Sequence, residues 1–342
     1  MALKNLALWA DRPYRNDAIF DAASPLNRDN CLSAFGLLKD LLAKAGWDCH
    51  THDVYKARGG RPDAVLFLDI PAAPVKELLG GWGGARSLAV LQECEVIKPR
   101  NWDKRLHAQF DALFTWSPAL VDGRRYFMVN FANHFPEPLP QSDAPRDKFC
   151  LTVAAHKMRN HPLEIYSERE KTIRWFEENH PGDFDLYGVG WDRPAFKSPA
   201  LTKIVNRLPL LPGLLAPRFP SYRGPLAQKR AVMEKYKFAV CYENARDIPG
   251  YITEKIFDCF FAGCIPVYLG AGDIAEHIPE KCFIDRRNFK THEELYSYMK
   301  ALPQAELAFM REAARNYLSS EAACQFSDNY FAATVAGVVS RA

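Results

Sequence analysis

The run KYKFAVCYENARDIPGYITEKIFDCFFAGCIPVYLG, from Lys235 to Gly270, decides the fold of this chain. Within it, Tyr236–Tyr242 is short, apolar and rich in β-forming residues, which predicts a buried strand. Asn, Asp, Pro and Gly in Glu243–Gly250 indicate a loop, and Cys264–Leu269 predicts a second strand. Two strands joined by a helix of this length imply a parallel, right-handed crossover. In such sheets ligands bind beyond the carboxyl ends of the strands.

The helix between these strands has its own signals. Thr253 can cap its first turn, and Glu254 follows in that turn. Gly263 ends the helical pattern. Four apolar residues before that glycine fall on one helical face, namely Ile256, Phe257, Phe260 and Phe261.

Lys255 has an unfavourable position for a lysine, in the first turn of this predicted helix. A lysine in the first turn faces the positive end of the helix dipole, which is mildly unfavourable. An anion at the same terminus would reverse that effect, so Lys255 suggests a phosphate site. The alternative is a solvated lysine whose stem packs on the sheet. The polar residues expected to cluster here are Glu243, Asn244, Tyr251, Glu254 and Lys255.

Length and composition indicate a globular protein of two domains. The chain has 342 residues, 48% of them hydrophobic and 25% charged, and a net charge of +3. That charge is too small to argue for a nucleic-acid partner. None of the nine cysteines has CxxC spacing, so we expect buried, reduced thiols and a cytoplasmic protein. No apolar run is long enough for a membrane span, and no signal peptide is evident.

Strands and helices alternate along most of the chain. The proline-rich polar run from Asn133 to Lys148 predicts a linker between two such series. Pro199–Pro225 is ambiguous between a loop that lines a cleft and a surface excursion. The predicted strands are Leu3–Trp9, Trp47–His52, Ala64–Asp69, Leu88–Leu91, Ala112–Thr115, Tyr126–Phe131, Phe149–Ala155, Phe184–Gly188 and Cys282–Asp285, besides the two above. The predicted helices are Cys31–Ala45, Pro74–Leu79, Trp102–Gln109, Glu164–Asn179, Glu293–Ala301, Gln304–Leu318 and Gln325–Val339.

The run around Lys255 closely resembles the signature of the family 10 glycosyltransferases, the α1,3/4-fucosyltransferases. Three further segments resemble the same family: LQECEVIKPRNWDKRLHAQFDALFTW, KFCLTVAAHKMRNHPLEIYSEREKTIRWF and HIPEKCFIDRRNFKTHEELYSYMK. The resemblance implies a GT-B fold, in which two Rossmann-like, doubly wound domains face each other across a cleft. It implies an acceptor-binding domain over 1–140 and a donor-binding domain over 141–342, with the last helix able to cross back to the first domain.

The resemblance also implies an inverting transfer of L-fucose from GDP-fucose, in an α1,3 linkage to a GlcNAc- or Glc-type acceptor. Such a reaction needs one carboxylate to take the proton of the attacking hydroxyl. The family pattern gives this role to Glu93, with Glu95 as the second candidate. A surface glutamate on a strand-end loop is the structural alternative. Cys94 and Glu95 stand where relatives often have Ser and Pro, which keeps the choice between the two glutamates open.

The donor-binding residues follow from the same resemblance. Arg169 and Lys255 would stabilise the departing diphosphate, which needs fixed cations if no metal is present. The alternative for Arg169 is an exposed helix ion pair. Glu254 would accept hydrogen bonds from the ribose, or act only as a first-turn charge. Asn244 and Tyr251 match positions that contact the nucleotide or the fucose, although Asn244 is also a common turn residue.

The implied partners are GDP-fucose and an oligosaccharide or glycolipid acceptor. No metal or other cofactor is obligatory, no nucleic acid is expected, and a lipid-linked acceptor would require peripheral contact with a membrane. Asp183-Phe184-Asp185 has the shape of a metal-binding DxD motif, but turn and strand-edge roles account for it. The rival hypotheses are a glycosyltransferase with another nucleotide-sugar donor, such as UDP-GlcNAc, a nucleotide-sugar binding protein without catalysis, and a non-binding scaffold.

Overall fold

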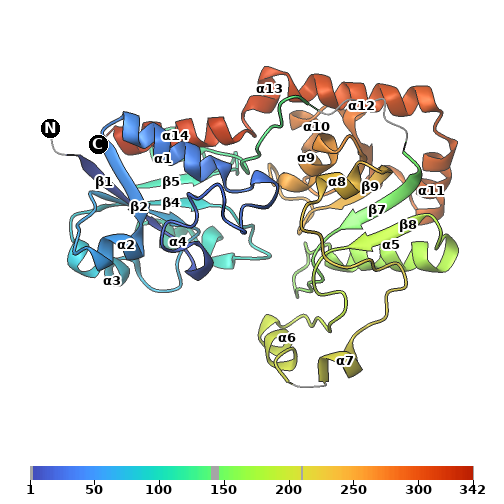
Figure 1. Cartoon of the computed structure of the whole chain (residues 1–342), viewed down its shortest axis with the longest axis horizontal. Coiled ribbons are helices and arrows are strands. Elements are labelled where there is room, and N and C mark those ends of the chain that lie inside the picture. Colours follow the sequence, from blue (N-terminus) through green and yellow to red (C-terminus); the bar gives the residue numbers. More distant parts are fainter. Residues whose placement is uncertain (1–2, 140–145, 209–210, 342) are drawn as a thin grey trace. The chain divides into compact units, whose positions relative to one another are not determined.

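The computed structural model describes residues 3–139, 146–208 and 211–341, which form two α/β units (Figure 1). The first unit comprises Met1–Phe135 together with Glu321–Ala342, and the second comprises Pro136–Ser320. The sequence-based boundary at 140/141 lies outside the described residues, as do Pro140 and Pro145 of the predicted linker. The segment from Glu321 onward is part of the first unit. The sequence-based division placed this segment in the second domain but allowed its last helix to cross back to the first.

The first unit is built on a six-stranded parallel sheet with the strand order β2-β1-β3-β4-β5-β6. Side chains alternate across it, so Leu6 and Leu8 join one core while Ala7 joins the other. On the first face α1 and α14 pack together, with the rings of Phe35 and Phe331 5.9 Å apart. The strands are β1 (Lys4–Trp9), β2 (Trp47–Thr51), β3 (Ala64–Leu68), β4 (Arg86–Leu91), β5 (Ala112–Thr115) and β6 (Tyr126–Met128). The α-helices are α1 (Ser33–Lys44), α2 (His52–Ala57), α3 (Val75–Leu79), α4 (Lys104–His107), α13 (Glu321–Cys324) and α14 (Asp328–Ser340).

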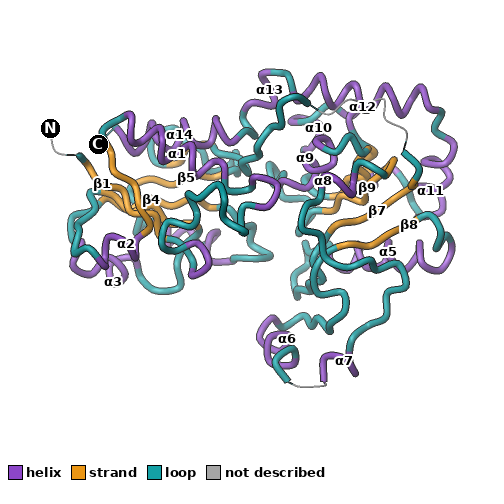
Figure 2. The backbone as a smooth tube through the Cα atoms, viewed as in Figure 1, coloured by secondary structure: helices purple, strands orange, loops and turns teal. Residues whose placement is uncertain are grey.

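The second unit is built on a five-stranded parallel sheet with the strand order β11-β10-β9-β7-β8. Its strands β9, β7 and β8 can be followed in Figure 2. Phe238, Val240 and Tyr242 alternate along its central strand and share one core with Ile173 and Phe176 of α5. The strands are β7 (Lys148–Val153), β8 (Phe184–Tyr187), β9 (Tyr236–Tyr242), β10 (Ile265–Leu269) and β11 (Ile284–Asp285). The α-helices are α5 (Tyr166–Asn179), α6 (Pro199–Val205), α7 (Leu211–Leu215), α8 (Arg230–Met233), α9 (Glu254–Phe261), α10 (Ile274–His277), α11 (His292–Ala301) and α12 (Gln304–Leu318).

The predicted α/β class with two parallel-sheet domains is confirmed, and so is the central crossover. Strand β9 has the predicted bounds, and β10 pairs with it in parallel. Helix α9 begins after Thr253, whose side chain accepts from the Lys255 backbone N–H. Gly263 follows the helix at a φ of +62°, a conformation that glycine adopts without strain.

The short helices α2, α8, α10 and α13 were not predicted. Several other differences lie at element ends and have local causes. The final helix begins at Asp328 rather than Gln325 because Ser327 caps it, accepting from the Tyr330 N–H. Strand β11 is shorter than predicted because a 3-10 turn occupies Glu280–Cys282. The ambiguous stretch Pro199–Pro225 contains two short helices and exposed apolar side chains, as in a surface excursion.

Two further expectations, on the cysteines and on membrane-spanning helices, can be compared with the structure. All nine cysteines are free thiols, and seven of them are buried. Within the part of the chain that the structure describes, no helix combines the length and apolar character needed to cross a membrane.

Candidate donor site at the start of α9

A buried carboxylate lies just beyond the carboxyl end of β9. Glu243 is fully buried, and both of its oxygens face the start of α9. Gly270, at the end of β10, makes room for it. A Cβ at Gly270 would lie 2.5 Å from the Glu243 Cγ and 2.4 Å from the Tyr268 hydroxyl. A side chain at position 270 would therefore displace Glu243.

Glu243 fixes the first turn of α9. Its Oε1 accepts from the backbone N–H of Thr253 at 2.9 Å, and its Oε2 accepts from the Thr253 hydroxyl at 2.6 Å. Negative charge at this terminus also complements the helix dipole. The sequence placed Glu243 in this cluster but did not predict its role in holding the helix start.

Lys255 points back toward the same carboxylate. Its Nζ lies 3.1 Å from Glu243 Oε2 and donates to the Thr253 hydroxyl at 2.9 Å. Burial acts to lower the pKa of Lys255, but Glu243, and next Glu254, outweigh it and hold the pKa above its usual value. Since only a fifth of the side chain is exposed, the alternative of a solvated lysine is wrong. Phosphate binding by Lys255 stays a prediction.

Glu254 presents a carboxylate that is 45% exposed, beside Lys255 at 3.5 Å. Burial favours its neutral form, yet the charges of Lys255 and Lys229 outweigh that effect and lower the pKa of Glu254 to about 2. Lys229, which the sequence analysis missed, pairs with Asp258 at 2.6 Å. The carboxylate is ionised at neutral pH and can accept hydrogen bonds from hydroxyl groups.

Arg169 reaches the site from α5. It is 3% exposed, and its Nη2 donates to the carbonyls of Tyr242 at 2.7 Å and Glu243 at 2.9 Å. Burial lowers its pKa below the usual value. The alternative of an exposed helix ion pair is therefore wrong, because this face of α5 packs on the sheet. In this structure Arg169 fastens the carboxyl end of β9, a role that the sequence did not predict.

Asn244 and Tyr251 lie together in the loop between β9 and α9. The Asn244 Nδ2 donates to the Tyr251 hydroxyl at 3.3 Å. Asn244 is half-buried, whereas Tyr251 is fully enclosed. The structure thus brings Asn244, Tyr251, Glu254 and Lys255 into one region of the second unit, as the sequence predicted for a site beyond the strand ends. Arg169, which the family resemblance added, lies in the same region. Their contact with a nucleotide remains a prediction.

Glu93 belongs to the first unit and follows β4. Its backbone N–H donates to Asp69 Oδ1 at 3.1 Å. Its carbonyl accepts from Asn101 Nδ2 and from Trp102 Nε1, each at 3.1 Å. The side chain is half-buried. These hydrogen bonds fix the backbone of Glu93, from which its side chain projects.

Asp69 organises that loop and was not singled out from the sequence. It sits at the end of β3 with a φ of +62°, and its Oδ1 also accepts from the Gln92 N–H at 2.8 Å and from Asn101 at 2.6 Å. Lys98 lies 3.2 Å from its other oxygen. One signal in the sequence could have identified Asp69. It lies at the end of the predicted strand β3, and the end of the neighbouring strand β4, before Glu93, lies beside it in a parallel sheet. Between the two candidate bases, Cys94 is fully buried while Glu93 and Glu95 are half-buried, so the choice between them stays open.

The DxD triplet is engaged in ion pairs. Asp183 lies 2.7 Å from Lys300, and Asp185 lies 2.8 Å from Lys148 and 2.6 Å from Arg223. Among the described residues, no group of three or more His, Cys, Asp or Glu side chains could hold a metal ion.

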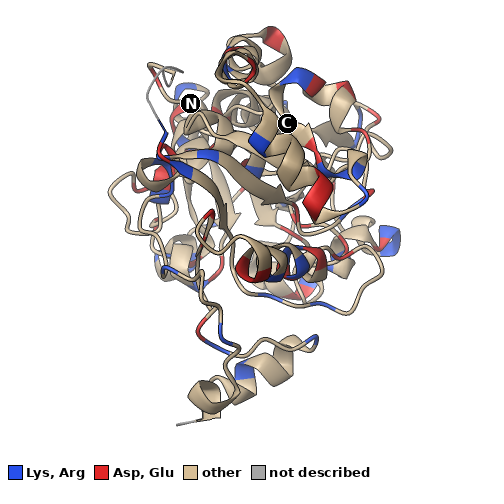
Figure 3. Ribbon diagram, turned by 90° about the vertical axis from the view of Figure 1, so that its right-hand side faces the viewer, with Lys and Arg blue, Asp and Glu red and all other residues tan. Residues whose placement is uncertain are grey.

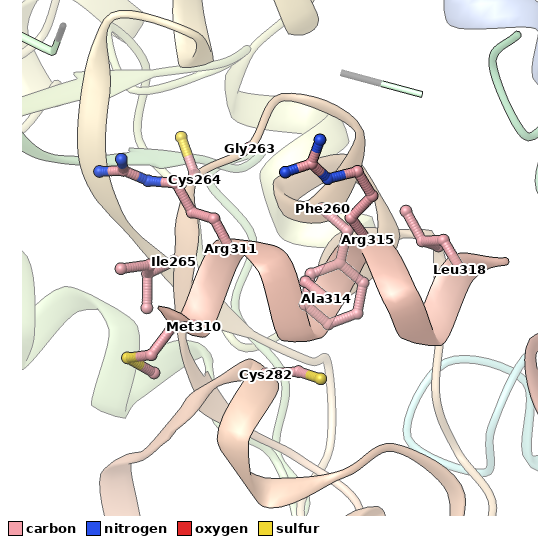
Figure 4. A pocket seen from close by; sticks show the side chains of 10 residues that line it. All are labelled: Phe260, Gly263, Cys264, Ile265, Cys282, Met310, Arg311, Ala314, Arg315 and Leu318. Carbon is pink, nitrogen blue, oxygen red and sulfur yellow. The ribbon is translucent and has the colours of Figure 1, made fainter. Parts of the chain in front are cut away.

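A separate pocket lies between α9, β10 and α12 (Figure 4). Apart from two arginines of α12, its walls are mostly apolar. None of the predicted site residues lines it. Its lining residues are Phe260, Gly263, Cys264, Ile265, Cys282, Met310, Arg311, Ala314, Arg315 and Leu318.

Residues 220–321, which include the start of α9, match the model of glycosyltransferase family 10 (fucosyltransferase), C-terminal part. The chain is similar to an alpha-(1,3)-fucosyltransferase, FucT, of Helicobacter pylori, with 34% identity over 92 residues, which are 27% of this chain and 19% of that protein. It is also similar to an alpha-(1,4)-fucosyltransferase of Arabidopsis thaliana, with 34% identity over 77 residues, covering 22% and 19%. The match thus spans about a fifth of the length of these relatives.

Solved structures resemble nearly the whole chain. A crystal structure of an alpha1,3-fucosyltransferase with GDP-fucose gives a TM-score of 0.53 at 16% identity, covering 98% of this chain and 90% of that one. An alpha-glucosyltransferase in complex with UDP and DNA gives a TM-score of 0.59 at 12% identity, covering 99% and 100%. At these identities the likeness shows the fold alone, and that fold is GT-B.

Proposed function

We propose that this chain, whose residues 220–321 carry the C-terminal domain of glycosyltransferase family 10 (fucosyltransferase), transfers L-fucose from GDP-fucose to a hydroxyl of an acceptor sugar. The family resemblance is confirmed for that segment. The observation that carries the proposal is the pairing of Lys255 with Glu243 and Thr253 at the first turn of α9, inside the matched segment. The fucosyltransferase names of the relatives support the donor sugar.

In this proposal the GDP diphosphate docks at the amino terminus of α9. The free N–H groups of a helix start and its dipole attract anions, and Lys255 adds a full positive charge. Glu243 keeps the ammonium in place before the donor arrives, so little reorganisation is needed when charge builds on the leaving group. Glu254 accepts from the ribose hydroxyls, and Asn244, oriented by Tyr251, contacts the nucleotide or the fucose.

Arg169 has a supporting role in the same proposed reaction. Its guanidinium is engaged by the carbonyls of Tyr242 and Glu243, where it fixes the strand end from which Asn244 projects. A cation in a poorly solvated position also exerts a stronger field than one in water. We therefore assign Arg169 to stabilising the GDP leaving group by charge and by positioning.

Glu93 is the proposed general base, with Glu95 as the second candidate. A diphosphate is a good leaving group, so a single carboxylate that takes the acceptor proton is enough. Attack from the face opposite the diphosphate inverts the anomeric carbon, giving an α1,3 linkage to a GlcNAc- or Glc-type sugar, free or lipid-linked. We propose that side-chain cations carry the charge of the leaving group, so chelation of divalent metal should leave turnover unchanged.

The decisive experiment is incubation of the chain with GDP-fucose and a panel of GlcNAc- and Glc-containing disaccharides, read by mass spectrometry. The expected result is one product carrying a deoxyhexose, formed with GDP-fucose and not with UDP-GlcNAc. Transfer from a uridine donor would favour another GT-B glycosyltransferase. GDP binding without transfer to any acceptor would favour a nucleotide-sugar binding protein.

A further inference from the structure

The segment 193–218 of the second unit, here called the basic arm, differs in charge from the rest of the chain. It contains no Asp or Glu, and its five cations are Arg193, Lys197, Lys203, Arg207 and Arg218. Its formal charge of +5 exceeds the +3 of the whole chain, so all other residues together sum to a net negative charge. All five cationic residues are exposed. The basic arm also precedes the segment 220–321 that matches the family model.

Large aliphatic side chains are exposed on the same segment. Ile204 is 59% exposed and Leu214 is 80% exposed. On α6, Leu201 and Ile204 are three residues apart and share one face. Clustered exposed apolar side chains on a soluble surface mark an interaction site more often than scattered ones do. The exposed members are Leu201, Ile204, Leu208, Leu214 and Leu215.

The basic arm is held firmly where it joins the unit. Phe219 packs edge-on against Trp191 at 4.9 Å, and Arg174 donates to the Arg218 carbonyl at 2.6 Å. Within the arm, Thr202 Oγ1 accepts from the Phe196 N–H at 2.9 Å. Thr202 is therefore turned toward the arm's own backbone while Ile204 is left exposed. In Figures 1 and 3 the helices α6 and α7 extend away from the sheet of their own unit, and Figure 3 shows basic but no acidic ribbon on them.

We propose that the basic arm docks on the surface of an anionic lipid bilayer. Its leucines and isoleucine would enter the boundary between headgroups and acyl chains, and its lysines and arginines would pair with lipid phosphates. Charge complementarity favours this partner, because all of the arm's charges have one sign. Apolar insertion and basic attraction together supply the two signals that stable peripheral binding needs. The inference concerns binding and holds independently of the proposed transferase activity.

Other partners fit the arm less well. Binding of single-stranded nucleic acid relies on exposed aromatic rings for stacking, whereas the aromatic residue of the arm, Phe196, is half-buried. A second copy of the chain would bring two cation-only surfaces together, which like-charge repulsion opposes. The large apolar side chains that are exposed between 201 and 215 are leucines and one isoleucine, which suits lipid.

The test is co-sedimentation of the full chain with vesicles of phosphatidylcholine, alone or mixed with phosphatidylglycerol. We expect binding to the anionic vesicles and its loss at high salt. At roughly five-fold per cation, Lys197→Gln with Lys203→Gln should weaken binding roughly 25-fold. The matched control is Lys281→Gln with Lys290→Gln, which removes two exposed lysines elsewhere in the same unit and should leave binding unchanged.

The apolar contribution has its own matched pair. Leu214→Ser should weaken vesicle binding roughly ten-fold, because the side chain could no longer be buried in the bilayer. Phe309→Ser removes a side chain of α12 that is 53% exposed and should have no such effect. A midpoint of thermal unfolding equal to that of the unmodified chain would show that the arm variants keep a folded second unit.

Several results would overturn the proposal. These are failure of the chain to bind anionic vesicles, equal losses in the lysine control, or full binding by Leu214→Ser. Binding of a single-stranded oligonucleotide, with vesicles left unbound, would assign the arm to nucleic acid instead. A dimer that Leu214→Ser dissociates, again without vesicle binding, would assign it to a second copy of this chain.

Discussion

The ammonium of Lys255 lies 3.1 Å from Glu243 Oε2, and Glu243 is fully buried. The pair joins the carboxyl end of β9 to the first turn of α9. Removing one partner of such a pair leaves the other charge without compensation. The pair also fixes in advance the cation that our proposal assigns to the diphosphate.

Glu243→Gln should destabilise the protein by about 3 kcal/mol, because it removes a buried charge that Lys255 and Thr253 depend on. The measurement is urea unfolding followed by far-UV circular dichroism. Glu306→Gln, at an exposed carboxylate of α12, is the matched control and should change the free energy of unfolding by less than about 0.5 kcal/mol. Equal stability of the two variants would contradict the role given to the pair.

Lys255→Ala should weaken GDP binding by roughly 10- to 100-fold, since it removes the positive side chain at the start of α9. Isothermal titration calorimetry with GDP measures this directly. Lys281→Ala, an exposed lysine in the same unit, should bind GDP as the unmodified chain does. If GDP affinity were the same in both variants, the diphosphate would have to dock elsewhere.

Glu93→Gln should reduce turnover by roughly 100- to 10,000-fold while leaving GDP affinity intact, because the amide cannot accept the acceptor proton. Product formation by mass spectrometry, together with GDP titration, separates catalysis from binding. Glu95→Gln is the comparison that resolves the open choice between the two glutamates. A loss confined to Glu95→Gln would transfer the role of base to that residue.

The loss of folding stability at low pH should depend in part on Glu254. Its pKa is lowered from an ordinary 4.5 to about 2. A group whose pKa is depressed on folding stabilises the protein above its unfolded pKa, and that stability is lost as pH falls toward the folded value. Because the carboxylate is 45% exposed, screening reduces the effect to less than about 1 kcal/mol. Glu254→Gln should therefore narrow the stability difference between pH 5 and pH 2, measured by the urea midpoint.

The same depressed pKa has a consequence for binding. Glu254 is ionised throughout the neutral range, so its contribution to GDP affinity should not change between about pH 5 and pH 8. A step in GDP affinity within that range, removed by Glu254→Gln, would contradict the assignment of the pKa.

The sequence correctly predicted those features that depend only on residues close together in the chain. The apolar run of β9, the cap at Thr253 and the glycine that ends α9 are local signals, and all three are confirmed. The environment of Arg169 was harder to predict, because the packing of α5 decides whether this side chain meets solvent or the sheet. Its burial against the carbonyls of Tyr242 and Glu243 could not be predicted from helix spacing.

The organisation of the Glu93 loop was missed for a related reason. Asp69 and Glu93 are 24 residues apart in the chain, and only the pairing of β3 with β4 brings them together. The same holds for Lys229, whose charge reaches Glu254 from another element. Residue types identified the candidate chemistry, whereas the supporting contacts depend on tertiary structure.

The position of α14 has a consequence for biosynthesis. Phe331, Val335 and Val339 of this helix complete a core that begins with Leu6 and Leu8 of β1. The first unit therefore cannot finish its hydrophobic core until residues near 340 have left the ribosome. The second unit is continuous from Pro136 to Ser320, so all of its residues emerge earlier. During translation the second unit can therefore complete its fold before the first unit receives its closing helix.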